Sequence, residues 1–261
     1  MKNLFLLTLV GAMLFVSCKK DNIIDEVTEK YTLIAKETAD NDLTVELYSK
    51  TTTLEVGYQN LYVKVKDAQG DIVKNATVLF EPEMDMGQMQ HGSPVVQPVY
   101  SSKSKLYEGT VIFTMPSGSM GSWVLAINVN GSDVVLPVEI SPSKTGTKYV
   151  GSYSGTDAKK YFVTLVKPFS WKVGMNDFSI MIHNVNVDHE FVPVEGLLIE
   201  FDPQMTSMSH GSPNNVNPTD KTGGYYKGKV NLTMTGDWRL FFDIYAEGEL
   251  IIEDAYIDIL F

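Results

Sequence analysis

Residues 121–127 read GSWVLAI and residues 236–242 read GDWRLFF, so Gly-x-Trp followed by an alternating apolar stretch occurs twice in the chain. Apolar side chains at every second position are typical of a β-strand with one buried face. Trp123 and Trp238 hold equivalent places, and we expect both to pack in a core near the corner of a sheet. A repeat of this size indicates that a whole domain occurs twice.

The similarity continues upstream of both stretches. Predicted strands at 61–65 (LYVKV) and 78–82 (VLFEP) align with 178–182 (FSIMI) and 199–203 (IEFDP). Equivalent tyrosines, Tyr107 and Tyr226, follow, and we expect both to be structural. Short strands separated by Gly, Pro and Asn turns favour an antiparallel sandwich. The sequence therefore predicts an all-β protein with two tandem immunoglobulin-like antiparallel β-sandwich domains.

The chain begins with a segment that is typical of export signals. Residues 4–16 are apolar, follow a short basic start and end in FVSC at residues 15–18. This ending resembles the lipobox of bacterial lipoproteins, and Cys18 is the single Cys of the chain. The resemblance implies cleavage before Cys18 and lipidation of its sulfur. An ordinary secretory signal and an uncleaved helical anchor are the alternatives.

These features divide the chain into four segments. A length of 261 residues suits two domains of about 110 residues each after the signal is removed. We predict a lipoprotein signal peptide at 1–17, a lipidated Cys and polar tether at 18–42, a first sandwich at 43–143 and a second at 148–261. The expected location is the bacterial cell envelope, anchored to the membrane by lipid.

Met and His residues concentrate in two loops, one per copy. Residues 86–94 read MGQMQHGSP and residues 205–213 read MTSMSHGSP. Met usually fills irregular gaps in a core, but here it stands among polar residues between two Pro. In this alignment the first copy has two extra residues between Phe80 and Met86 and an additional Met84.

Thioether sulfur and imidazole nitrogen together are suited to copper(I). We predict one Cu(I) per loop, bound by Met86, Met89 and His91 in the first copy and by Met205, Met208 and His210 in the second. Met84, Met115 and Met234 are possible additional ligands, although packing in the core is the alternative reading for Met115 and Met234. Zinc fits less well, because it prefers Cys, His and carboxylates, and calcium and magnesium require oxygen ligands.

The order of these features resembles a known family. A strand ending in Pro, a Met-rich His-Gly-Ser-Pro loop, Tyr-x-Gly-x-Val, a Met and Gly-x-Trp are similar to the YtkA-like and FixH-like domains, over most of each copy. That resemblance implies small sandwich domains of bacterial envelopes that are associated with copper handling or cytochrome oxidase assembly. It also implies the same six Met and His positions as metal ligands.

Composition and motifs argue against other functions. A net charge of −11 and a single Arg, Arg239, disfavour nucleic acid as a partner. We find no nucleophile elbow, zinc-protease motif or phosphate loop, and we expect no enzymatic activity. His183 and His189 have no counterparts in the first copy and are expected to be exposed.

Two hypotheses remain for the function. The first is a copper-binding envelope lipoprotein that buffers copper or exchanges it with a donor or acceptor protein of the envelope. The second is a structural or adhesive surface lipoprotein that binds glycan or protein without a metal. The second hypothesis requires that the Met and His residues of the loops are packing features.

Overall fold

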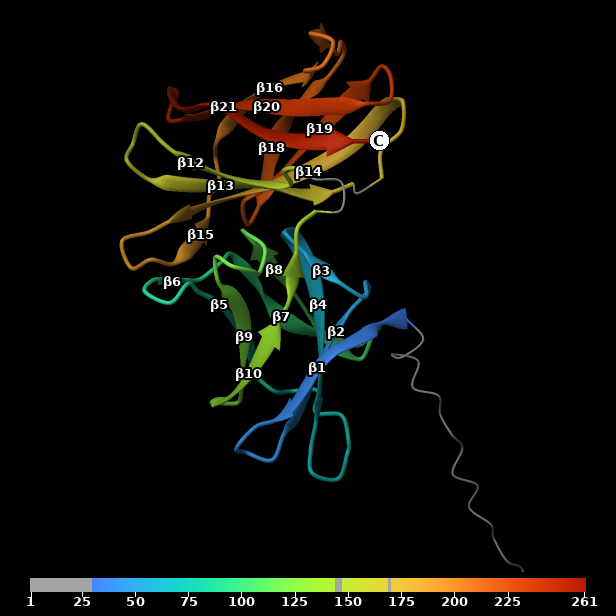
Figure 1. Cartoon of the computed structure of the whole chain (residues 1–261), viewed down its shortest axis with the longest axis vertical. Helices are drawn as coiled ribbons and strands as arrows, with labels where there is room; N and C mark the ends of the chain where they lie inside the picture. Colours follow the sequence, from blue (N-terminus) through green and yellow to red (C-terminus); the bar gives the residue numbers. More distant parts are fainter. Residues whose placement is uncertain (1–29, 144–146, 169) are drawn as a thin grey trace, which may run out of the picture.

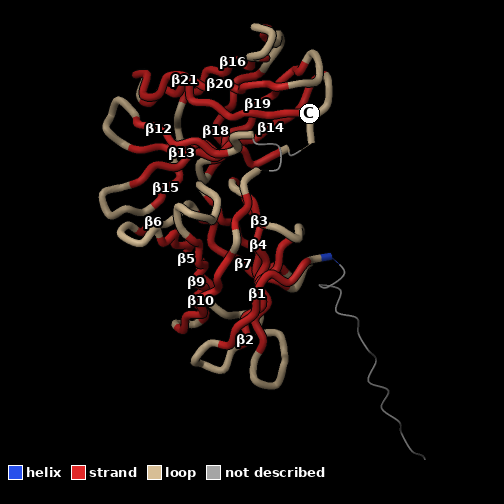
Figure 2. The backbone as a smooth tube through the Cα atoms, in the orientation of Figure 1, coloured by secondary structure: helices blue, strands red, loops and turns tan. Residues whose placement is uncertain are grey.

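The computed structural model describes residues 30–143, 147–168 and 170–261. The predicted signal peptide and the lipidation site Cys18 lie outside these residues. All of the named elements in the described part are β-strands, as Figure 2 shows for both halves of the molecule. None of the described residues forms a helix that is long and apolar enough to cross a membrane.

The first half of the chain folds into eleven strands. They are β1 (Thr32–Thr38), β2 (Thr44–Ser49), β3 (Leu54–Glu55), β4 (Gly57–Lys66), β5 (Val78–Asp85), β6 (Gln90–His91), β7 (Val95–Ser101), β8 (Leu106–Phe113), β9 (Ser122–Val129), β10 (Ser132–Val138) and β11 (Ile140–Ser141). One sheet has the order β1-β2-β4-β8-β7 and the other β10-β9-β5-β6, while β11 and β3 form a short parallel pair. The core lies between the two larger sheets.

The second half folds into ten strands. They are β12 (Val150–Ser154), β13 (Lys160–Lys167), β14 (Gly174–Val185), β15 (Phe191–Pro193), β16 (Leu198–Met205), β17 (His210–Gly211), β18 (Val216–Thr222), β19 (Tyr225–Leu232), β20 (Asp237–Ala246) and β21 (Glu249–Leu260). One sheet has the order β12-β13-β14-β19-β18, with β15 beside β14, and the other has the order β17-β16-β20-β21.

The two halves have the same strand order in both of their sheets. Taken across each sheet, β1, β2, β4, β8 and β7 correspond to β12, β13, β14, β19 and β18, and β10, β9, β5 and β6 correspond to β21, β20, β16 and β17. Along β5 and β9 buried and less buried side chains alternate, because one face of each strand meets the core. The prediction of two tandem antiparallel sandwiches is confirmed.

The first sheet begins earlier than the sequence indicates. β1 lies within the stretch that we interpreted as a tether, and it pairs with β2 from Thr32 to Thr38. Its side chains are polar or only half-buried because β1 is an edge strand, stabilised mainly by its backbone bonds to one neighbour. A strand of this kind lacks the apolar alternation that reveals a strand in a sequence.

The second domain packs against one end of the first, as Figure 1 shows. Ile112 of β8 forms an apolar cluster with Val150, Val166 and Met181, which come from β12, β13 and β14. The hydroxyl groups of Tyr58 and Tyr225 lie 3.0 Å apart beside this cluster. The sheet that contains β14 therefore faces the first domain, and the sheet that contains β16 and β17 lies on the far side.

Candidate metal site at the domain interface

Each domain has a Met-His hairpin, formed by β5 and β6 in the first and by β16 and β17 in the second. Its paired strands place a His beside a buried Met. In the first domain Met84 lies opposite His91 on one side and opposite Trp123 on the other. In the second domain Met205 lies opposite His210. Because opposite residues of antiparallel strands point to the same face, His, Met and Trp form a row across the sheet.

This register corrects the alignment of the two loops. Phe80-Glu81-Pro82-Glu83-Met84 aligns without a gap with residues 201–205, so Met84 is the structural equivalent of Met205. The two extra residues of the first copy lie in the hairpin between Met84 and His91, not before Met86. Met86 therefore has no counterpart in the second domain. The repeated Met-x-x-Met-x-His spacing had aligned Met86 with Met205, because the strand register cannot be seen in the sequence.

The buried methionines explain the Gly of each Gly-x-Trp motif. Met84 and Met205 are 0% and 2% exposed. A Cβ atom at Gly121 would lie 2.4 Å from the carbonyl oxygen of Asp85 and 3.0 Å from the methyl group of Met84, and one at Gly236 would lie 2.5 Å from the methyl group of Met205. Both glycines also have positive φ angles, of 150° and 137°. Any other residue would therefore be strained and would displace the methionine.

The two tryptophans fix the segments that follow β8 and β19. Trp123 and Trp238 are buried, as predicted. The indole N–H of Trp123 donates to the carbonyl oxygen of Met115 at 2.9 Å, and that of Trp238 donates to the carbonyl oxygen of Met234 at 3.0 Å. Met115 and Met234 thus hold equivalent backbone positions beside the two hairpins.

The predicted structural role of the tyrosines is also confirmed. The Tyr107 hydroxyl donates to the carbonyl oxygen of Val73 and accepts from the backbone N–H of Ala76. The Tyr226 hydroxyl does the same with Val194 and Leu197. Each tyrosine therefore ties the loop before β5 or β16 to the opposite sheet.

The imidazole of His91 points one nitrogen at a thioether. Its Nδ1 lies 2.8 Å from the carbonyl oxygen of Gly92, which can only accept, so Nδ1 carries the proton. In the neutral ring this leaves a lone pair on Nε2, which lies 3.4 Å from Sδ of Met115. A ligating His is commonly held in this way, with its second nitrogen bonded to a carbonyl group.

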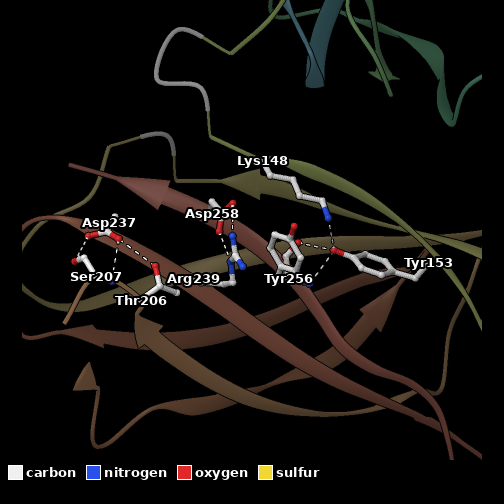
Figure 3. Close-up of polar contacts among 8 residues, drawn as sticks. All are labelled: Lys148, Tyr153, Thr206, Ser207, Asp237, Arg239, Tyr256 and Asp258. Atoms are coloured by element: carbon white, nitrogen blue, oxygen red, sulfur yellow. Dashed lines mark hydrogen bonds and ion pairs between the residues drawn. The ribbon is translucent and has the colours of Figure 1, made fainter. Parts of the chain in front are cut away.

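The second domain arranges the same hairpin differently. Nε2 of His210 lies 3.0 Å from Oγ1 of Thr233, so a hydroxyl group stands where the first domain has a thioether. Asp237 accepts hydrogen bonds from Thr206 and Ser207 and holds the hairpin (Figure 3). Met208, at the hairpin, is 63% exposed, and Met234 packs against the core.

The remaining methionines of the first hairpin have separate environments. Met86 packs partly against the core of the first domain. Met89 is 63% exposed, the same fraction as Met208. The structure thus brings His91 and Met115 into direct contact, exposes Met89 and buries Met84.

His91, Met115 and Met89 line a cavity of about 1220 Å³ between the two domains. Its other wall comes from the second domain and includes Phe162, His189 and Phe191. Figure 1 shows β6 and β15 next to each other at this boundary. No pattern in the sequence indicates that the segments around β6 and β15 lie together, so the cavity could not be predicted from the sequence.

Two histidines of the second domain have no counterparts in the first copy, and exposure was predicted for both. His189 is exposed in the turn before β15, as predicted. His183 is only 1% exposed, so the prediction of exposure was wrong for it. It lies on the face of β14 that is turned toward the first domain, opposite Phe162 and Pro193 of the adjacent strands. Burial lowers the pKa of His183 to about 4.

The residues of the first hairpin fit a soft metal ion. Bonds of about 2.0 Å to nitrogen and about 2.3 Å to sulfur let one ion contact two atoms that are 3.4 Å apart. Within the described ranges no group of three or more His, Cys, Asp and Glu side chains could hold a metal. The two donors that the structure brings together are the imidazole of His91 and the thioether of Met115, a pair that suits Cu(I).

Comparisons with known proteins cover both the sequence and the fold. No curated protein matches the chain. Among solved structures it is similar to the Escherichia coli adhesin FdeC, with 13% identity over 86% of this chain and 65% of that chain and a TM-score of 0.27. It is also similar to invasin, a bacterial integrin-binding protein, with 14% identity over 83% and 39% and a TM-score of 0.29. Domains 5–6 of the S-layer protein SbsC give 15% identity over 87% and 98% and a TM-score of 0.31.

The chain spans less than two thirds of the FdeC and invasin chains that it matches. One family model matches, that of the YtkA-like family, over residues 156–241. The match runs from the turn before β13 into β20, so it includes the hairpin with Met205, Met208 and His210. Residues 156–241, which form most of the second sandwich, therefore match the YtkA-like family.

Proposed function

We propose that this protein is a copper(I)-binding lipoprotein of the bacterial cell envelope that buffers copper or exchanges it with a partner protein. The observation that carries the proposal is the approach of His91 Nε2 to Met115 Sδ at 3.4 Å, in the lining of the cavity between the domains. The tautomer with the proton on Nδ1, which the Gly92 carbonyl favours, turns the lone pair of Nε2 toward Met115. Both donor atoms are of the kind that binds Cu(I).

The first domain supplies the tighter site in this proposal. The Gly92 carbonyl orients the His91 ring, so this side chain loses little freedom when an ion binds, and Trp123 fixes the backbone carbonyl of Met115 beside it. Met89 is exposed and can complete the site. In the second domain, His210 and Met208 form a weaker site, because the Thr233 hydroxyl at His210 is a poor ligand for a soft ion.

The structural or adhesive alternative has one observation in its favour. Met84 and Met205 are buried, and His91 and His210 pack edge-on against Trp123 and Trp238 at ring distances of 5.4 and 6.1 Å. Those contacts are sufficient to explain a repeated His-Met pair without any metal. Met115 also packs against the core of its domain, as Met234 does. Packing does not explain the exposure of Met89 and Met208.

A competitive Cu(I) titration tests the proposal. We expect the chain from Lys19 onward to bind one Cu(I) tightly and a second more weakly in the presence of a chromophoric Cu(I) chelator and a reductant. Zn²⁺ in a parallel titration should bind much more weakly than Cu(I). Absence of Cu(I) binding in competition with the chelator would favour the structural alternative.

A further inference from the structure

The cavity between the domains has a charge opposite to that of the protein. The chain carries a net charge of −11. The cavity is nevertheless lined by three lysines, Lys148, Lys159 and Lys160, and by one acidic residue, Glu83. Clefts lined by one sign of charge attract ligands of the opposite sign.

Each of these lysines has a partner within the second domain. Lys148 donates to the Tyr153 hydroxyl at 2.9 Å and lies over the ring of Tyr256 (Figure 3). Lys159 lies 3.4 Å from Asp157 in an exposed ion pair, which contributes little to stability and leaves the ammonium group accessible. Lys160 extends over the ring of Phe162, 5.3 Å from its centroid.

Apolar side chains lie beside these charges. Phe162 and Phe191 pack edge to face at 5.2 Å, and both line the cavity with Val187, Met89 and Met115. A volume of about 1220 Å³ exceeds the roughly 300–1,000 Å³ of pockets that hold small molecules. The size and the mixed lining suit a segment of polypeptide with alternating acidic and apolar side chains.

The first domain also offers backbone groups to such a segment. β6 is the terminal strand of its sheet, and Gln90, His91 and Gly92 line the cavity. An extended segment can add to a strand at a sheet edge through main-chain hydrogen bonds. It would then lie next to Nε2 of His91 and Sδ of Met115.

We propose that the cavity between the domains is a docking site for an extended acidic segment, with interspersed apolar residues, of a partner protein. This inference rests on the proposed function in one respect, that copper passes between the protein and the docked partner. Docking at this place would bring the partner to the copper ligands. The lysines select the acidic side chains, and the Phe162–Phe191 pair accepts the apolar ones.

The test uses fluorescence anisotropy of the apo chain from Lys19 onward, without copper. The probe is a short fluorescein-labelled peptide that alternates Glu with Met and Leu. We expect saturable binding that weakens with added salt, and a loss of about tenfold or more in affinity for the double variant Lys159→Glu, Lys160→Glu. A peptide with Lys in place of Glu should bind wild-type protein at least tenfold more weakly.

The matched control is the double variant Lys103→Glu, Lys105→Glu. These exposed lysines precede β8 at the end opposite Ile112, roughly 20 Å from the domain interface. Peptide affinity should be unchanged in this variant. An equal loss in both double variants, absence of saturable binding, or equal binding of a peptide of Glu alone would overturn the proposal. Retained docking with no Cu(I) binding would refute only the proposed function.

Discussion

Replacing Met115 by Leu is expected to weaken Cu(I) binding at the first domain by at least about tenfold, and His91→Ala in the same chain by at least as much. Leu keeps the volume of the side chain but has no sulfur, so the packing beside Trp123 changes little. Loss of groups that merely support a metal ligand costs about 10- to 100-fold in affinity. Loss of a ligand itself should cost no less. Competition with a chromophoric Cu(I) chelator measures the change.

The repeat supplies a matched control for this experiment. Met234 holds the equivalent backbone position in the second domain, where the Thr233 hydroxyl occupies the place beside His210. Met234→Leu should therefore leave the tighter Cu(I) affinity unchanged. Equal effects of Met115→Leu and Met234→Leu would show that the His91–Met115 pair is not the site.

Met84→Ala is expected to lower the free energy of unfolding by about 2–5 kcal/mol, as is typical for a buried Met replaced by Ala. Met84 is 0% exposed and lies between His91 and Trp123 in the core of the first domain. Met89→Ala, at 63% exposure, should change stability by no more than about 0.5 kcal/mol. Urea denaturation followed by far-UV circular dichroism measures both values.

The second domain again provides a comparison. Met205→Ala should destabilise the protein as Met84→Ala does, and Met208→Ala should behave as Met89→Ala does, because the exposures match in pairs. A small loss of stability for Met84→Ala would contradict the structural equivalence of Met84 and Met205. It would return Met84 to the set of possible metal ligands.

The sandwich fold could be predicted from the sequence because its strands repeat. The Gly-x-Trp motif and the strands before it occur twice, and alternation along β5 and β9 follows directly from one buried face. β1 was missed because an edge strand needs few apolar side chains. His183 was misjudged because β14 lies between two other strands, where Phe162 and Pro193 flank it.

The candidate site could be predicted only in part. His91 and Met89 were predicted from residue type and spacing, since soft donors are rare in polar loops, whereas Met115 was only a possible additional ligand. Their relative positions depend on the strand register, which places Met84, and not Met86, opposite His91. The opposite wall of the cavity, with Phe162 and His189, is formed by a domain contact for which the sequence carries no pattern.

The most direct test of the copper site is X-ray absorption spectroscopy at the copper edge on the chain loaded with one equivalent of Cu(I). We expect at least one sulfur neighbour at about 2.3 Å together with the outer-shell scattering of an imidazole. His210→Ala should leave that spectrum unchanged, because the first equivalent occupies the first domain. A spectrum with only nitrogen and oxygen neighbours, or one that loses its imidazole signal in His210→Ala, would contradict a site formed by His91 and Met115.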